Sequence, residues 1–139
     1  MAESNRTPPD RARQPIADVR VRASIRMLIP AGKRKESLDI LALMINRIQH
    51  KEGCLTCRLY RDAMSRQWLM YEEVWASEKA FRRHLHSHEL RSVLLVVEMA
   101  AEPPEIRFDR MVRLPGIDAI EDVRKGADAA PGEYQQLGY

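Results

Sequence analysis

The segment "VRVRASIRMLI", residues 19–29, alternates apolar and polar side chains and gives the clearest indication of the fold. One side of it carries Val19, Val21, Ala23, Ile25 and Met27. The other side carries arginines and a serine. A period of two residues is typical of a β-strand that packs one face against a core. We therefore expect a strand here, and we expect Pro30 and Gly32 to end it.

Helical and strand patterns follow one another along the rest of the chain. Residues 34–51 place apolar side chains at helical spacing, and Gly53 then favours a stop. Ser77 and Ser87 are good N-caps for two successive helical pieces. The expected elements are, in order, a strand at 19–29, a helix at 34–51, strands at 54–62 and 67–75, helices at 78–86 and 88–100, a strand at 105–114 and a short helix at 116–125.

The order of these elements predicts the fold class. It is β-α-β-β-α-β, the ferredoxin-like pattern of an α+β domain, with a four-stranded antiparallel sheet and helices on one face. Met27, Leu59 and Phe108 suggest that neither face of the sheet is wholly polar. Since helices cover one face alone, we expect two copies to pack sheet to sheet as a homodimer.

Length and composition favour a single soluble domain. The chain has 139 residues, of which 45% are hydrophobic and 31% charged, with a formal net charge of +3. We expect a flexible N-terminal arm over residues 1–18, the domain over 19–113, and a short helix and tail over 114–139. The basic residues lack the aromatic spacing or motifs of a nucleic-acid binder. There is no apolar run long enough for a membrane span and no secretory signal, so a cytoplasmic protein is expected.

Three stretches resemble a known family when taken together. They are "EGCLTCRLYRD" (52–62), "YEEVWASEKAFRRHLHS" (71–87) and "HELRSVLLVVEMAAEPPEIRF" (88–108). Residues 19–113 are similar to the antibiotic biosynthesis monooxygenase (ABM) family of dimeric α/β-barrel proteins, above all in the spacing of Glu73, Trp75, Ala80 and His84. The resemblance implies a dimer of ferredoxin-like subunits, each with a pocket between helices and sheet. It also implies oxidation of phenols or hydroquinones by molecular oxygen without flavin, metal or haem.

The histidines at 84, 86 and 88 differ in the direction that a helix would give them. His84 shares a helical face with Phe81 and Leu85, so it should face the interior, whereas His86 should face solvent. The direction of His88 depends on whether Ser87 starts a new helix. His84 is either a structural histidine of the core or a general base, because an imidazole can accept a phenolic proton at physiological pH.

Aromatic side chains supply the candidate substrate contacts. Tyr71 and Trp75 share a face of their strand by parity, and Tyr60 is a weaker candidate on the neighbouring strand. They are either aromatics of the core and dimer interface, or the walls of a pocket for an aromatic substrate.

Cys54 and Cys57 with His84 and His88 could suggest a zinc ligand set. Residues three apart on a strand point to opposite faces, however, so we expect no metal site and no disulfide between the cysteines.

These observations favour a cofactor-independent monooxygenase, an oxidoreductase that acts on a small phenol or hydroquinone with oxygen. His84 is the expected catalytic residue, and Trp75, Tyr71 and Tyr60 are the expected substrate contacts. One alternative is a non-catalytic dimeric protein that binds a small molecule. The other is a haem-degrading monooxygenase, although Ala23, Ser24 and Ile25 stand where the resemblance leads us to expect an asparagine.

Overall fold

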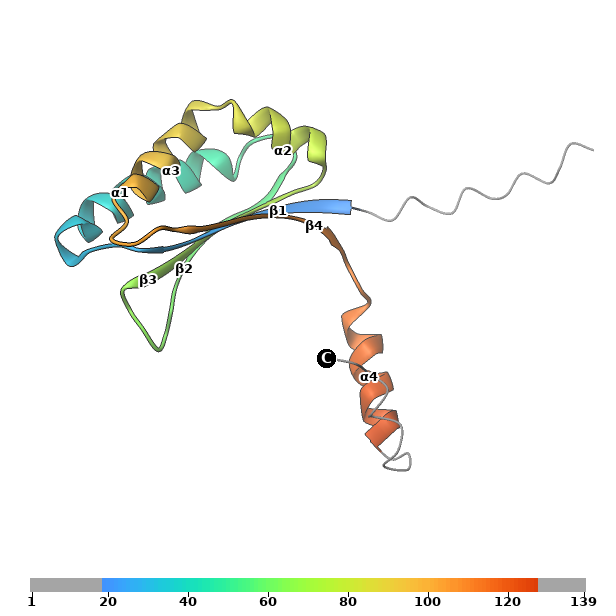
Figure 1. The fold of residues 1–139 in the computed structure, drawn as a ribbon. Coiled ribbons are helices and arrows are strands. Elements are labelled where there is room, and N and C mark those ends of the chain that lie inside the picture. The colour runs from blue at the N-terminus through green and yellow to red at the C-terminus, as the bar shows by residue number, and fades with distance from the viewer. Residues whose placement is uncertain (1–18, 128–139) are drawn as a thin grey trace, which may run out of the picture.

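The computed structural model describes residues 19–127, in which helices α1, α2 and α3 cover one face of a sheet while α4 stands beyond its end (Figure 1). The expected arm over residues 1–18 and the end of the expected tail, 128–139, lie outside the described residues. The elements are β1 (Val19–Leu28), the 3₁₀ turn η1 (Ala31–Lys33), α1 (Arg34–Ile48), β2 (Cys54–Arg61), β3 (Trp68–Trp75), α2 (Glu78–Leu85), α3 (His88–Glu98), β4 (Glu105–Val112) and α4 (Gly116–Ala127).

The sheet confirms the ferredoxin-like prediction. Its four strands lie in the order β2-β3-β1-β4, and each neighbouring pair is antiparallel. The expected β-α-β-β-α-β order is present. Seven of the eight predicted elements begin at the expected residue, and their last residues differ from the prediction by no more than three. The alternating segment at residues 19–29 forms β1, the strand that pairs with both β3 and β4.

The helix-covered face of the sheet holds the core. The register places Val21, Ala23, Ile25 and Met27 of β1 beside Trp75, Glu73, Tyr71 and Leu69 of β3, and all eight are buried. Helix α1 contributes Leu41, Met44 and Ile48, and α3 contributes Val93, Val96 and Val97. These side chains repeat at helical spacing, so one stripe of each helix lies on the sheet.

The sheet has apolar side chains on both faces, as expected, but the three residues that suggested this all share one face. Ala23 pairs with both Phe108 and Glu73, while Leu59 pairs with Tyr71. Since paired residues of antiparallel strands share a face, Met27, Leu59 and Phe108 all lie on the helix-covered side. Parity within one strand does not reveal how the faces of different strands align. The apolar side chains of the opposite face are instead residues such as Trp68, Met70 and Val74.

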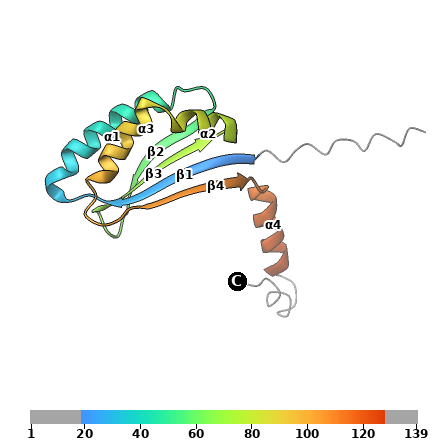
Figure 2. The ribbon, with the colours of Figure 1, turned by 45° about the horizontal axis from the view of Figure 1, so that its top comes forward.

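The opposite side of the sheet, which we call the open face, is not covered by any described helix (Figure 2). By register it carries Arg20, Arg22, Ser24 and Arg26 of β1, Thr56, Arg58 and Tyr60 of β2, Trp68, Met70, Glu72 and Val74 of β3, and Arg107, Asp109 and Met111 of β4. Ionic and cation–π contacts cross it: Arg22 pairs with Glu72 at 3.3 Å, and the Arg26 guanidinium lies 4.0 Å from the centre of the Trp68 ring. The open face is therefore mixed, with charged and apolar side chains side by side.

Two serines set the break between α2 and α3, as the sequence predicts. The Ser77 hydroxyl accepts a hydrogen bond from the Ala80 amide, and the Ser87 hydroxyl accepts one from the Leu90 amide. Each satisfies an amide that has no partner within its own helix. The chain turns at Ser87, so α2 and α3 lie on the sheet with different axes (Figure 2).

Candidate active site

A buried carboxylate forms the centre of the site. Glu73 of β3 is 1% exposed, and its neighbours two residues away on the same strand both donate to it. The Tyr71 hydroxyl donates to Oε2 at 2.5 Å, and the Trp75 indole Nε1 donates to Oε1 at 2.9 Å. A buried charge is stable only when it is paired and hydrogen-bonded. Side chains two residues apart on a strand point to the same face, so Tyr71 and Trp75 both lie where they can donate to Glu73.

His84 of α2 completes the cluster from the helix side. It is 2% exposed, and its Nε2 lies 2.9 Å from Oε1 and 3.0 Å from Oε2 of Glu73. Its ring stacks on Trp75 with the centroids 4.6 Å apart and 29° between the planes. Because a carboxylate accepts hydrogen bonds, Nε2 is the nitrogen that carries a proton toward Glu73.

The other ring nitrogen of His84 meets two groups that can donate. The Ser87 Oγ lies 3.2 Å from Nδ1 and the Lys51 ammonium 3.5 Å from it. Since Ser87 Oγ already accepts the Leu90 amide, its hydroxyl hydrogen can point at Nδ1. These contacts fit a neutral imidazole whose Nδ1 lone pair is an acceptor.

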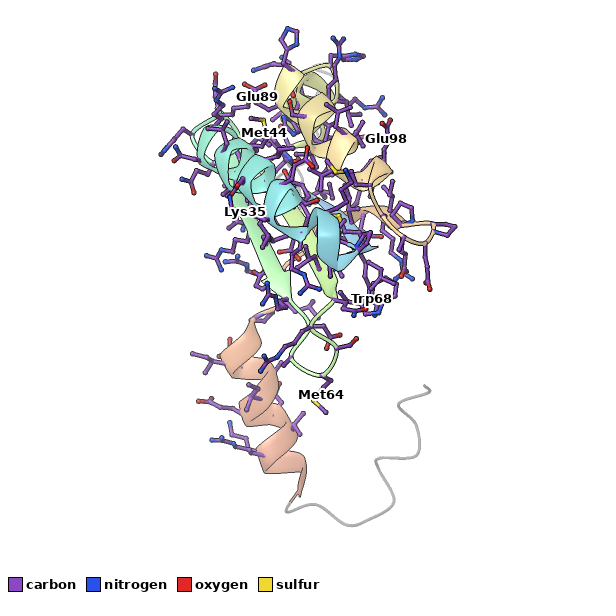
Figure 3. All side chains as sticks on the ribbon, turned by 90° about the vertical axis from the view of Figure 1, so that its left-hand side faces the viewer. Lys35, Met44, Met64, Trp68, Glu89 and Glu98 are labelled. Carbon is purple, nitrogen blue, oxygen red and sulfur yellow. The ribbon has the colours of Figure 1, made fainter. Side chains whose placement is uncertain are left out.

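Lys51 is held in place by an ion pair with α3. Its Nζ lies 2.9 Å from Glu89 Oε2, and hydrogen bonding from Lys51 lowers the pKa of the Glu89 carboxyl. Figure 3 shows Glu89 at the end of the domain opposite to Trp68, so the whole cluster lies at the Trp75 end of β3.

A cavity of about 230 Å³ opens beside this cluster. It is lined by Lys51, Glu52, Trp75, Ala80, Arg83 and His84. Its wall therefore combines an indole and an imidazole with an ammonium group close to His84 Nδ1. A small monocyclic aromatic molecule with a hydroxyl group fits that combination of apolar wall and polar groups.

The hydroxyl of Tyr71 stays protonated in this environment. Burial, together with the charge of Glu73, raises the pKa of Tyr71 well above its ordinary value. Its hydroxyl therefore donates to Glu73, and the Cys57 Sγ lies 3.3 Å from the same hydroxyl oxygen. Tyr71 lines none of the cavity, so its contact is with Glu73.

The structure brings together three of the four predicted site residues. His84 and Trp75 line the cavity, and Tyr71 supports both through Glu73. Tyr60 is 44% exposed on the open face, on the other side of the sheet, and has no contact with this cluster. His86 and His88 are exposed, which confirms the outward direction expected for His86.

Sequence reasoning did not identify Glu73 and Lys51 as site residues. Glu73 lies between Tyr71 and Trp75 in the two-residue alternation of β3, at a position where an apolar side chain is expected. A glutamate at that position was the signal that could have identified it as a site residue. Lys51 comes from the turn after α1, and no local pattern places it against α2.

The expectation that Cys54 and Cys57 face opposite sides is wrong. The pairing of β2 with β3 slips between Cys54 and Thr56, so that Cys54 pairs with Trp75 and Cys57 with Glu73. This bulge turns both cysteines toward the helix-covered face. They are not bridged to each other in the structure. Within residues 19–127, no three His, Cys, Asp or Glu side chains are grouped so that they could hold a metal ion.

Fold and site together define a ferredoxin-like subunit with a buried carboxylate–imidazole pair beside a small cavity. The family model for antibiotic biosynthesis monooxygenase matches residues 20–93, more than half of the chain. The chain belongs to this family. No curated protein matches the sequence significantly. None of the helices within residues 19–127 is long and apolar enough to cross a membrane.

Solved structures share the fold. A conserved protein from Methanosarcina mazei Go1 has 19% identity and a TM-score of 0.62, with 67% of this chain and 93% of that chain covered. Rv0793 from Mycobacterium tuberculosis has 22% identity and a TM-score of 0.62, with 69% and 98% covered. A structure described as antibiotic biosynthesis monooxygenase has 16% identity and a TM-score of 0.58, with 68% and 99% covered. At these identities the likeness concerns the fold alone.

Proposed function

We propose that the protein is a cofactor-independent monooxygenase that oxidises a small phenol or hydroquinone with molecular oxygen. The observation that carries the proposal is the pair of Glu73 and His84, with Nε2 at 2.9 Å from the carboxylate and the ring at the wall of the cavity. Membership of the monooxygenase family supports the reaction class. The substrate and the absence of a cofactor belong to the proposal.

His84 is the base in this proposal. A phenolic hydroxyl enters the cavity and takes the place beside Nδ1 that Lys51 Nζ occupies at 3.5 Å. Nδ1 accepts the proton, and Glu73 stabilises the imidazolium through Nε2, as a carboxylate does for a catalytic histidine. Trp75 packs against the ring of the substrate.

Lys51 stabilises the phenolate that forms. Its ammonium group remains within reach of the developing negative charge, while Glu89 holds it at the rim. The electron-rich phenolate then gives electrons to oxygen more readily than the neutral phenol does. For phenol itself the balanced reaction consumes one O₂ and gives a quinone and one water, so the substrate supplies all four electrons.

Oxygen uptake tests the reaction. The purified protein, dialysed against a chelator, is assayed in an oxygen electrode with a panel of phenols and hydroquinones, and the product of ¹⁸O₂ turnover is analysed by mass spectrometry. We expect uptake above the buffer rate for at least one monocyclic substrate and one ¹⁸O atom in its product. Binding of these compounds without uptake would instead support a non-catalytic binding protein. Stoichiometric haem binding followed by haem breakdown would support a haem degrader.

The proposed functional unit is a homodimer formed through the open face. No helix within residues 19–127 covers that face, and Trp68, Met70 and Val74 are only partly covered within one copy. A stable interface buries at least ~1,000 Å² in total. A monomer in light scattering at micromolar concentration would remove this part of the proposal.

A further inference from the structure

The turn between α2 and α3 brings a hydroxyl group to the buried histidine. Ser87 Oγ lies 3.2 Å from Nδ1 of His84, while Nε2 on the other side of the ring lies 2.9 Å from Glu73 Oε1. The turn itself fixes this approach, because the Ser87 amide donates to the His84 carbonyl at 2.9 Å. A hydroxyl, an imidazole and a carboxylate are therefore joined in one chain of contacts, the order of groups that activates a serine as a nucleophile.

The burial of the three groups suits these roles. Glu73 and His84 are 1% and 2% exposed, whereas Ser87 is partly exposed. The buried carboxylate holds the imidazole in the form with its proton on Nε2 and its lone pair on Nδ1. That lone pair is the base that meets the serine hydroxyl. The one member of the three that has to reach a substrate carbonyl is also the one that solvent reaches.

A comparison of two helix caps singles out Ser87. The hydroxyls of Ser77 and Ser87 each accept an amide of the helix that follows, from Ala80 at 3.1 Å and from Leu90 at 3.2 Å. Within residues 19–127, a histidine nitrogen lies within hydrogen-bond distance of the Ser87 hydroxyl and not of the Ser77 hydroxyl. Since a serine hydroxyl has one hydrogen to donate, Ser87 can cap α3 and direct that hydrogen to Nδ1 at the same time.

The surroundings of Nδ1 supply the other parts of an acyl-transfer site. His84 lines the cavity of about 230 Å³ together with Trp75 and Lys51. The Lys51 ammonium lies 3.5 Å from the same Nδ1 atom, close to the place where negative charge develops on a carbonyl oxygen under attack by Ser87. The indole of Trp75 offers a flat apolar wall to an aryl group. A small aryl ester matches both features.

We propose that the protein also hydrolyses small aryl esters, with Ser87 as the nucleophile, His84 as the base and Glu73 as the group that positions the imidazole. Ser87 Oγ forms a bond to the carbonyl carbon while its proton passes to Nδ1. The bond from that carbon to the aryloxy oxygen breaks, and Nδ1 returns the proton to the leaving phenol. Water then attacks the acyl-serine by the same route, which releases the carboxylic acid and restores Ser87. The reaction uses no oxygen, so it does not depend on the proposed monooxygenase function.

Labelling with a fluorophosphonate tests the nucleophile, because this reagent forms a stable covalent bond with an activated serine. The intact protein is treated under argon, digested and analysed by mass spectrometry at several times. We expect an adduct on Ser87 that forms at least ~10-fold faster than any adduct on Ser77, and that is lost in His84→Ala. Equal rates at the two serines, or no adduct on Ser87, would show that Ser87 only caps α3.

Hydrolysis of 4-nitrophenyl acetate under argon measures the activity itself. Ser87→Asn removes the hydroxyl but keeps a side chain that caps helices as well as serine does, and it should lower kcat/KM by ~100-fold or more. The same substitution at the other cap, Ser77→Asn, should leave kcat/KM unchanged. Full esterase activity in Ser87→Asn would overturn the role of Ser87, whatever the oxygen-uptake assay gives.

Discussion

The imidazole of His84 and the carboxylate of Glu73 meet across the helix–sheet boundary, with Nε2 2.9 Å from Oε1 and both side chains 1% exposed. Tyr71 and Trp75 saturate the same carboxylate from the strand. The acid is thereby committed to three donors, whereas Nδ1 of the histidine contacts Ser87 Oγ at 3.2 Å and Lys51 Nζ at 3.5 Å. In this arrangement Glu73 and its donors are fixed, while Nδ1 of His84 can exchange one partner for another.

Glu73→Gln should disturb both stability and turnover. The amide offers only one oxygen acceptor, so one of the donors from Tyr71, Trp75 or His84 faces an N–H group. An unsatisfied buried donor costs about 1–3 kcal/mol, which urea unfolding would detect. If His84 is the base, kcat/KM should fall ~10²-fold, because its imidazolium loses the stabilising charge.

The matched control is the adjacent residue on the same strand. Glu72 points to the open face, where it pairs with Arg22, and Glu72→Gln should leave turnover unchanged. Equal effects of the two substitutions would show that the buried carboxylate has no special role.

His84→Ala tests the base directly. We expect turnover of a confirmed phenolic substrate to fall by roughly 10²- to 10⁴-fold, as for the loss of a general base. The fold should survive, which circular dichroism would check, since the lost ring borders an existing cavity. His86→Ala removes an exposed imidazole two residues away and should change neither activity nor stability. If both variants were fully active, His84 would be a structural histidine.

The sequence was sufficient for the fold because its periodicities are local and strong. The two-residue period of β1, the helical spacing in α1 and the caps at Ser77 and Ser87 are each fixed by near neighbours. The inward direction of His84 followed from the same rule, through its spacing from Phe81.

The errors lie where long-range pairing determines the outcome. The bulge between Cys54 and Thr56 changes which side of the sheet Cys54 faces, and no residue type in β2 predicts a bulge at that point. The face occupied by Phe108 depends on the register of β4 with β1, which parity cannot supply. Glu73 was missed because a carboxylate is ordinarily expected in solvent, and its burial becomes favourable only once Tyr71, Trp75 and His84 surround it.

Gly53→Ala should destabilise the protein by about 2 kcal/mol or more, because a left-handed conformation alone costs roughly 1–2 kcal/mol with a Cβ. Gly53 has φ of +84°, and an added Cβ would stand 2.5 Å from the Cβ of Ala80. Gly32→Ala is the control, since open space surrounds Gly32 and its effect should stay within about 0.5 kcal/mol. Thermal unfolding measures both. Equal stability of the two variants would contradict the close approach of Gly53 to α2.

Cys54 and Cys57 should react slowly with thiol reagents in the folded protein. Burial raises the pKa of Cys54 to about 11 and that of Cys57 to about 12, against an ordinary 9.0. Since the thiolate is the reactive form, the folded protein at pH 8 should be modified about 100-fold more slowly at Cys54 and about 1,000-fold more slowly at Cys57 than the unfolded chain. Mass spectrometry after timed alkylation, with and without urea, distinguishes the two sites. Modification of Cys57 at the unfolded rate would show that its surroundings are not dry.

The same shifts predict how stability depends on alkaline pH. A thiol whose pKa is higher in the folded state favours folding below pH 9, where both states keep the proton. As pH rises from 9 toward 12, the unfolded chain loses its thiol protons first, so the free energy of unfolding should fall across that window. Cys57→Ala removes the larger shift and should make the decline shallower, although the lost sulfur lowers stability at neutral pH. Urea unfolding of both proteins between pH 8 and 10.5 measures the slopes. A variant with the same slope as the wild type would show that the Cys57 thiol does not contribute to the decline.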